Sequence, residues 1–212
     1  MLKPLRLRSH EVSDPAKMPY DERYTPYIRR LRLLPFIHLV SRSTVNMNPA
    51  AITALVDRWR PETHSFHLRT GEMTVTLQDM SMILALPIDG TPVCFSTESD
   101  GWRANMEGMI GMSPALNADP KKNRTPAGAT FRWISTHFSH CPEGANDDVI
   151  ERYARVYVWY VISRALFADS SGRIAPWMWL KALSSWDSNL SWGSAALAYL
   201  YRQVILLIST CM

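Results

Sequence analysis

The chain has 212 residues, of which 47% are hydrophobic and 20% are charged, and its formal net charge is +4. A chain of this length can bury a substantial core, and its eight tryptophans argue against intrinsic disorder. Three widely spaced cysteines, Cys94, Cys141 and Cys211, exclude a disulfide framework and indicate a reducing compartment. The uninterrupted apolar runs are too short to span a bilayer and no signal peptide is visible, so we expect a soluble intracellular protein.

The positive charge is concentrated at the N-terminus. Residues 1–32 contain eight Lys or Arg against four acids, whereas the remainder contains fifteen of each. Prolines among the charges of residues 1–24 predict a flexible basic lead-in. Such an arm can bind nucleic acid by releasing counterions from phosphates. A solvated tail that flanks a domain is the simpler interpretation.

The first half of the chain contains start and stop signals for short helices. Pro35 predicts that residues 27–40 form two short pieces instead of one helix. Asn48 and Pro49 predict the start of a helix over Pro49–Trp59, because Asn caps free N–H groups and Pro suits the first turn. We expect Pro61 to end that helix.

Residues 66–77 then change to an alternating pattern. Phe66, Leu68 and Met73 alternate with polar side chains around a turn at 69–72, which predicts one short β-hairpin near residues 65–77 with one buried face. Thr76 and Asp79 have the spacing of a capping box, which predicts a helix after the hairpin. The residues that we expect to face inward on that helix are Met80, Ile83 and Leu84.

The second half of the chain is predicted to be helical after a long loop or linker over residues 96–129. Helices are expected over Phe131–Phe138, Val149–Phe167, Pro176–Trp186 and Trp192–Leu207. The run Val156–Ile162 is apolar on every side and could be a strand by pattern alone, but its acidic N-terminal flank favours a buried helix. The sequence therefore predicts a mainly α protein, a single helical domain with one short hairpin.

Three stretches of the chain resemble the plant mobile domain family. The first is LVDRWRPETHSFHLRTGEMTVTLQDMSMILALPIDGTPV at residues 55–93. The second is the pair RYARVYVWYVISRALFADSSGRIAPWMWLKAL and SWGSAALAYLYRQ, which ends at Gln203, and the third is PYDERYTPYIRRLRLLPFIHLV near the front. The resemblance covers roughly residues 19–203 and assigns residues 25–212 to one such domain. The final VILLISTCM departs from the family's usual continuation, which indicates a truncated domain.

The resemblance also identifies the residues that carry the family signature. They are Trp59, Arg60, Glu62, Thr63, Phe66, Gly71, Glu72, Leu77, Asp79, Leu86, Pro87, Gly90, Trp192 and Gly193. By resemblance, we expect a nuclear protein that takes part in meristem maintenance, genome stability and silencing of transposable elements. The same resemblance implies a phosphatase-seven-like protein as partner. Many family copies are encoded by transposons.

Two groups of residues have spacings that suggest a metal site, but the support for a metal site is weak in both. His64 and His67 are three apart in a predicted strand, where they point to opposite faces, so hairpin hydrogen bonding explains them better. His137, His140 and Cys141 share the spacing of one helical face and could hold zinc with a water molecule. The alternative for these three residues is a role at a helix end, and we expect no metal.

Enzyme chemistry finds little support in the residues. Family members are often labelled aminotransferase-like, and Lys181 is the only lysine of the core region that could form a Schiff base with pyridoxal phosphate. No phosphate-binding loop is visible near it, since Ser170, Ser171 and Gly172 look like a turn. Hydrolase and phosphatase motifs are absent as well. We expect no cofactor and no catalytic residue.

Two functions from different classes therefore remain. The first is a non-enzymatic nuclear module that binds another protein, with residues 106–112 as one adaptable Met-rich surface, unless that segment folds back on the core. The second is a transposon-derived protein associated with nucleic acid, with Arg58, Arg60 and Arg69 as a possible basic patch beside the N-terminal arm. Most of the tryptophans lie in apolar helical stripes, so we expect them to pack in the core instead of stacking on bases.

Overall fold

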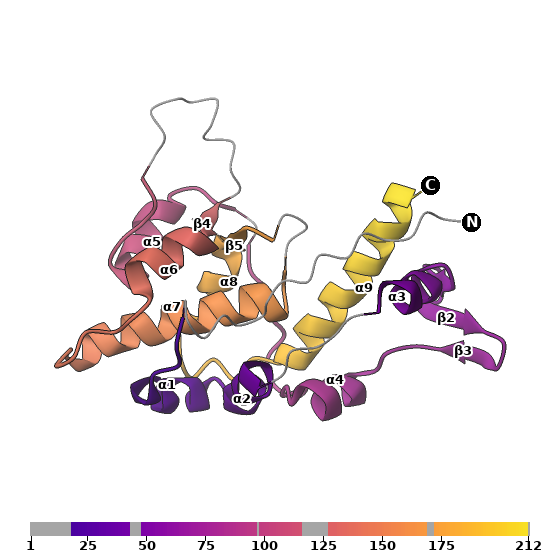
Figure 1. Cartoon of the computed structure of the whole chain (residues 1–212), viewed down its shortest axis with the longest axis horizontal. Helices are drawn as coiled ribbons and strands as arrows, with labels where there is room; N and C mark the ends of the chain where they lie inside the picture. Colours follow the sequence, from indigo (N-terminus) through magenta and orange to yellow (C-terminus); the bar gives the residue numbers. More distant parts are fainter. Residues whose placement is uncertain (1–17, 43–47, 97, 116–126, 169–171, 212) are drawn as a thin grey trace.

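The computed structural model describes residues 18–42, 48–96, 98–115, 127–168 and 172–211. Within these ranges the fold is mainly α-helical, as predicted, with two small antiparallel sheets (Figure 1). One sheet has the order β1-β2-β3 and the other pairs β4 with β5. Figure 1 shows a helical body around α7 and a smaller lobe formed by α3 and the three-stranded sheet.

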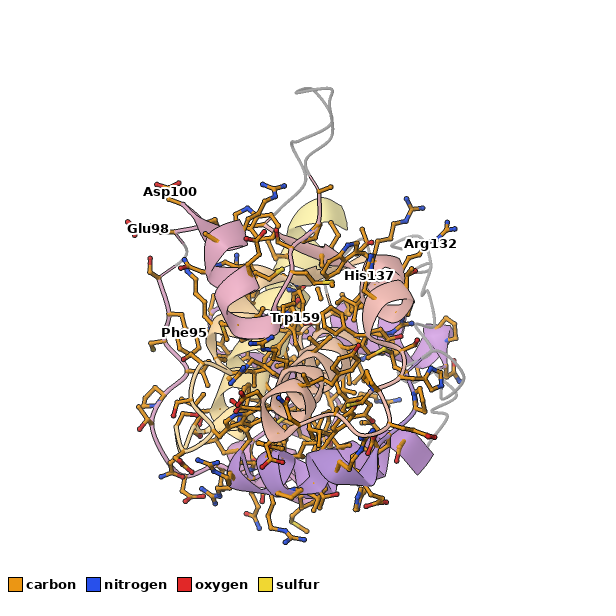
Figure 2. All side chains as sticks on the ribbon, turned by 90° about the vertical axis from the view of Figure 1, so that its left-hand side faces the viewer. Phe95, Glu98, Asp100, Arg132, His137 and Trp159 are labelled. Atoms are coloured by element: carbon orange, nitrogen blue, oxygen red, sulfur yellow. The ribbon has the colours of Figure 1, made fainter. Side chains whose placement is uncertain are left out.

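Helix α7 (Asp147–Ala165) is the centre of the body. Its N-cap residue Asn146 accepts a hydrogen bond from the backbone N–H of Val149, and two acids occupy its first turn, where they complement the helix dipole. All seven side chains of Val156–Ile162 are buried, which confirms the predicted buried helix over the strand alternative. Helices α5 (Trp102–Ile110), α6 (Phe131–Phe138) and α8 (Trp177–Lys181) pack against it; Figure 2 looks onto this side of the body, with Trp159 of α7 at its centre.

The N-terminal elements pack against α7 from another side. They are η1 (Glu22–Tyr24) and α1 (Thr25–Arg30), and α2 (Leu34–Arg42) packs against α1. Two separate helices confirm the predicted break, but the chain turns at residues 31–33, and Pro35 lies in the first turn of α2, where its missing N–H costs nothing. The prediction of a flexible lead-in was wrong for residues 18–24, because Met18 and Tyr24 are buried in the core. Residues 1–17 lie outside the described ranges.

The smaller lobe contains α3 (Pro49–Val56), β1 (Trp59–Arg60), β2 (Ser65–Leu68) and β3 (Gly71–Met73). Asn48 caps α3 as predicted, but the helix ends before Trp59, because Trp59 pairs with Phe66 as part of an unpredicted third strand. The hairpin is confirmed, with Leu68 opposite Gly71 across a two-residue turn. Its predicted buried face was wrong at Met73, which is 59% exposed.

Helix α4 (Leu77–Leu84) follows the hairpin and starts with the predicted capping box. The Thr76 hydroxyl accepts a hydrogen bond from the Asp79 backbone N–H, and the Asp79 carboxylate accepts one from the backbone N–H of Thr76. Met80 is buried, as predicted, whereas Ile83 is 66% exposed and was wrongly expected to face inward.

The predicted loop over residues 96–129 was wrong. Its central part forms α5, and its end forms β4 (Gly128–Thr130), which pairs with β5 (Ile174–Pro176). Met106 and Ile110 lie four residues apart on α5 and are buried in the core. This packing excludes them from the adaptable surface that the sequence predicts. Residues 116–126 lie outside the described ranges.

Helix α9 (Trp192–Cys211) connects the body with the smaller lobe. It begins beside α7 and α8 and runs outward past α4 to α3, as the yellow helix of Figure 1 shows. It extends beyond the predicted end at Leu207, whereas α8 is shorter than the predicted Pro176–Trp186. No helix built from the described residues combines the length and the apolar character that crossing a bilayer requires.

Candidate interaction surface

Large apolar side chains are exposed along one segment from β3 to the residues after α4. Most large apolar side chains of a folded domain are buried, yet five of the nine exposed ones in the described ranges lie within residues 73–88. They are Met73 (59% exposed), Leu77 (38%), Met82 (75%), Ile83 (66%) and Ile88 (37%). We call these five residues the β3–α4 surface. These side chains are grouped along the sequence, and a contiguous exposed apolar patch is typical of a contact site for another protein, so we take this segment as the candidate.

A groove lies beside this surface, between α4 and the α1–α2 corner. Its volume is about 540 Å³, and its lining residues come from two segments that are some fifty positions apart in sequence: Arg29, Arg32, Leu34 and Pro35 on one side, and Ser81 with residues 85–87 on the other. A second hollow of about 240 Å³ lies between α4 and α9, where Met80 and Leu84 line it together with Ala196 and Leu200. Helix α4 therefore lines both recesses with neighbouring faces.

The arginines around the groove differ in what they bind. The guanidinium of Arg32 donates to both carboxylate oxygens of Asp89, at 2.7 and 3.0 Å, and to the side-chain oxygen of Asn189 at 2.9 Å. Hydrogen bonding to Arg32 holds the pKa of Asp89 below its usual value. Arg30 forms an ion pair with Asp187. Arg29 is exposed and forms no ion pair with any described residue.

Two glycines of the signature allow the segment after α4 to lie directly against the start of α9. Thr91 and Leu190 form a parallel bridge, and the Gly193 N–H donates to the Pro87 carbonyl at 2.8 Å. A Cβ on Gly90 would lie 2.2 Å from the Asn189 carbonyl oxygen, and one on Gly193 would lie 2.6 Å from a methyl carbon of Ile88. Only glycine fits this close backbone approach, which also fixes the position of α4.

An aromatic cluster attaches the three-stranded sheet to α9. The ring of Tyr201 lies 5.3 Å from that of Trp59 and stacks on that of His64 at 5.5 Å. The Tyr201 hydroxyl is 2.6 Å from the Val75 carbonyl oxygen, to which it donates, and 2.8 Å from the Thr74 hydroxyl. These contacts join the end of β3, and with it the β3–α4 surface, to the long C-terminal helix.

The remaining signature residues also serve the fold. Leu86, Pro87 and Trp192 are buried. The Glu72 carboxylate accepts a hydrogen bond from the Ser65 hydroxyl, which in turn pairs with that of Thr63. Phe66 packs edge-on against Trp59, Gly71 takes a positive φ at the hairpin turn, and Asp79 completes the capping box. Three further signature residues have exposed side chains that take no part in these contacts with the fold: Arg60, Glu62 and Leu77.

Comparison with known proteins shows which family the chain belongs to. The family described as plant mobile domain matches residues 35–210. The chain belongs to the plant mobile domain family. This match begins later than the resemblance seen in the sequence, which starts near residue 19. It continues past Gln203 to residue 210, so residues 204–210 do not depart from the family as expected.

Three relatives from Arabidopsis thaliana place this plant mobile domain more closely. It is 38% identical to Protein MAIN-LIKE 2 over 74% of the chain and 23% of that protein, and 34% identical to Protein MAINTENANCE OF MERISTEMS over 76% of the chain and 33% of that protein. It is 36% identical to Serine/threonine-protein phosphatase 7 long form homolog, over 76% of the chain and 12% of that protein. The chain thus spans a third or less of the length of these relatives. No solved structure matches it.

The histidine and cysteine candidates of this plant mobile domain do not come together. Helix α6 ends at Phe138, so His140 and Cys141 lie beyond it, and Cys141 is buried whereas His140 is exposed. His137 Nδ1 is 2.8 Å from the Trp133 carbonyl oxygen. Among the described residues, no group of three or more His, Cys, Asp or Glu side chains could hold a metal ion, and this includes His64 and His67.

Lys181 does not fit the role of a Schiff-base lysine. Its amine donates to the backbone carbonyls of Ser96 and Glu98, at 3.0 and 2.6 Å, and lies over the Trp177 ring. The lysine therefore fastens the segment before α5 to α8. Of the predicted turn at 170–172, Ser170 and Ser171 lie outside the described residues, and Gly172 has a positive φ.

The three arginines of the predicted basic patch all belong to the smaller lobe. Arg58, Arg60 and Arg69 are exposed, and the Arg58 guanidinium donates to the Ala54 carbonyl at 2.7 Å. The same lobe exposes three acids, Asp57, Glu62 and Glu72, so its charges balance. A basic patch here stays a prediction.

Local patterns in the sequence did not reveal the groove or the exposure of Met82 and Ile88. One signal was present for Met82. On a helix whose core side is formed by Met80 and Leu84, position 82 lies on the opposite face, so an apolar residue there must face solvent.

Proposed function

We propose that this plant mobile domain is a non-enzymatic module that binds another nuclear protein through the β3–α4 surface. The observation that carries the proposal is the exposure of Met82 and Ile83, at 75% and 66%, on a helix fixed at both ends. Transferring such side chains from water into an interface is favourable by about 25 cal/mol per Å² of apolar area. Methionine also adapts its shape to different partners.

The way in which α4 is held supports a binding role. The capping box fixes its start, and the approach of Pro87 to Gly193 fixes the chain just beyond its end. A rigid surface loses little conformational entropy on binding, so more of the apolar contact appears as affinity.

The relatives suggest where such a module acts. The name of Protein MAINTENANCE OF MERISTEMS refers to the maintenance of meristems. The phosphatase 7 long form homolog contains a segment similar to this chain. We propose a role in meristem maintenance and in silencing of transposable elements, in the nucleus, with a phosphatase-seven-like protein as partner.

Co-elution of the chain with the purified phosphatase 7 long form homolog in size-exclusion chromatography tests the proposal. The wild-type chain should form a complex, and the double variant Met82→Ser with Ile83→Ser should not. Leu55→Ser is the matched control, because Leu55 is 42% exposed on α3, outside the surface. A complex that survives the double variant would contradict the proposed surface.

The second function, association with nucleic acid, is less well supported. Arg23, Arg30 and Arg32 from the basic N-terminal region form ion pairs with Asp21, Asp187 and Asp89 within the fold. These pairs leave fewer cations for phosphates. Arg58→Glu and Arg69→Glu test this alternative: unchanged affinity for duplex DNA would exclude the patch.

A further inference from the structure

The groove between α4 and the α1–α2 corner combines apolar walls with one positive charge that forms no ion pair among the described residues. Leu34 and Pro35 form part of one wall, and Leu86 and Pro87 part of the other. Arg29 lines the groove and is exposed, whereas Arg32 is already neutralised by Asp89. A ligand that fits this site needs an apolar side chain for the walls and a single carboxylate for Arg29.

The shape of the groove is set by two residues in the left-handed region. Arg32 has φ 61° and Ala85 has φ 53°, and each lies where its wall changes direction at the end of a helix. Such a conformation costs a non-glycine residue about 1–3 kcal/mol and persists only where the surroundings hold it. The bonds from Arg32 to Asp89 and Asn189 provide that support. The walls are therefore fixed before any ligand arrives.

We propose that this groove binds a short acidic segment of a protein partner, in which an aliphatic or aromatic residue lies close to an Asp or Glu. The inference rests on the proposed function, because it adds a specific contact beside the β3–α4 surface. Arg29 pairs with the carboxylate, and the apolar residue packs against Leu34, Pro35 and Ala85, which are not buried. Charge complementarity selects the acid, and the apolar walls select its neighbour.

Charge also argues against nucleic acid as the occupant. A phosphate backbone needs several cations in a row, because each contact neutralises one charge of a regular series. Near the groove, Arg30 and Arg32 are paired with Asp187 and Asp89, whose side chains are 69% and 70% exposed. Among the described residues around the groove, Arg29 is thus a single cation outside any ion pair, which suits one carboxylate better than a row of phosphates.

Charge reversal at Arg29 tests the inference. The probes are a random short-peptide phage library and the purified phosphatase 7 long form homolog. The wild-type chain should select peptides in which an acid lies beside an apolar residue, and Arg29→Glu should lose that preference and bind the phosphatase homolog roughly tenfold more weakly. Arg58→Glu is the control, since Arg58 is also exposed but lies in the smaller lobe.

The outcomes separate this inference from the proposed function. If Arg29→Glu binds the phosphatase homolog like the wild type while Met82→Ser with Ile83→Ser does not bind, the groove is excluded and the β3–α4 surface stands. If the wild-type chain does not bind the homolog at all, that partner fails, and the groove is then judged by the library alone. Selection of basic peptides or of none, or loss of duplex DNA binding in Arg29→Glu, would overturn the inference.

Discussion

Single residues at the contact between the two halves of the chain determine whether α4 is held in place. Gly90 has φ 112°, and its Cα faces the Asn189 backbone at a distance that leaves no room for a side chain. A Cβ on Gly193 would lie 2.6 Å from the Ile88 Cγ2 methyl and 3.1 Å from the Pro87 carbonyl oxygen, but Gly193, unlike Gly90, does not have a positive φ. The two signature glycines therefore differ in how strictly they are required.

Replacing Gly90 by Ala should destabilise the protein by about 1–3 kcal/mol or more, because the new Cβ meets a backbone carbonyl and the backbone conformation is strained. Gly193→Ala should cost less. Gly108→Ala is the control: Gly108 lies within α5, has nothing within 4 Å of an added Cβ, and should gain roughly 0.5–1 kcal/mol of stability. Urea unfolding measures all three. A fully stable Gly90→Ala protein would contradict the close approach.

Glu151 should make the stability of the folded protein depend on pH in the acid range. Burial raises the pKa of Glu151, but hydrogen bonds from Trp186 and Arg155 together with the Arg155 charge outweigh it, so the pKa lies below its ordinary value of 4.5. A carboxyl group whose pKa is lowered by folding stabilises the folded state above pH 4.5, and that contribution is lost as the pH falls through the folded pKa. Glu151→Gln should be less stable at neutral pH and should lose less stability on acidification. An unchanged dependence of unfolding on pH below 4.5 would contradict this role.

At the scale of elements, the start of α4 is the feature on which the proposed surface depends. Thr76 and Asp79 satisfy backbone donors that would otherwise lack partners. Thr76→Ala should destabilise the protein by about 1 kcal/mol, and it should weaken partner binding as well, because Met82 and Ile83 lose their fixed orientation. Thr70→Ala, in the exposed hairpin turn, is the control. Thermal unfolding together with the co-elution assay detects both effects. If Thr76→Ala lowers stability but binding is unchanged, the capping box does not orient Met82 and Ile83 for the partner.

Elements with strong local signals could be predicted from the sequence. The Asn48 cap, the Thr76–Asp79 capping box and the buried run of α7 are each encoded in a few adjacent residues, and the structure confirms them. Helix α5 was missed because its segment is rich in Gly and Met and lies between Gly101 and Gly111, so burial against α7 stabilises it more than its own propensity does. Strand β1 has two residues and exists only through its pairing with β2.

The candidate site was less accessible to prediction. Its groove joins residues 29–35 to residues 81–87, and no local pattern encodes their meeting. The signature residues could be named from the resemblance, but most of them support the fold, while Arg29 and Met82 lie beside them without belonging to the signature.

At the scale of the whole molecule, α9 makes the body and the smaller lobe one structure. Its Tyr201 hydroxyl bonds to Val75 and Thr74, on the lobe side, and its Tyr199 hydroxyl donates to the Ala168 carbonyl, on the body side. Tyr201→Phe should lower stability by about 0.5–1.5 kcal/mol and raise hydrogen exchange in β3 and residues 74–76. Tyr199→Phe should leave that exchange unchanged. Equal exchange in β3 for wild type and Tyr201→Phe would show that the hydroxyl does not attach the lobe.

Binding of a protein through an apolar surface is tested most directly by capture of partners from plant nuclear extract on the purified chain, washed at increasing salt and read by mass spectrometry. We predict that a phosphatase-seven-like protein is retained at high salt by the wild-type chain and is lost with Met82→Ser and Ile83→Ser. Apolar contacts are insensitive to salt, whereas about six to ten phosphate contacts would lose about 10³–10⁵ in affinity between roughly 50 and 200 mM salt. Recovery of nucleic acid alone, released as the salt rises, would contradict the proposed function.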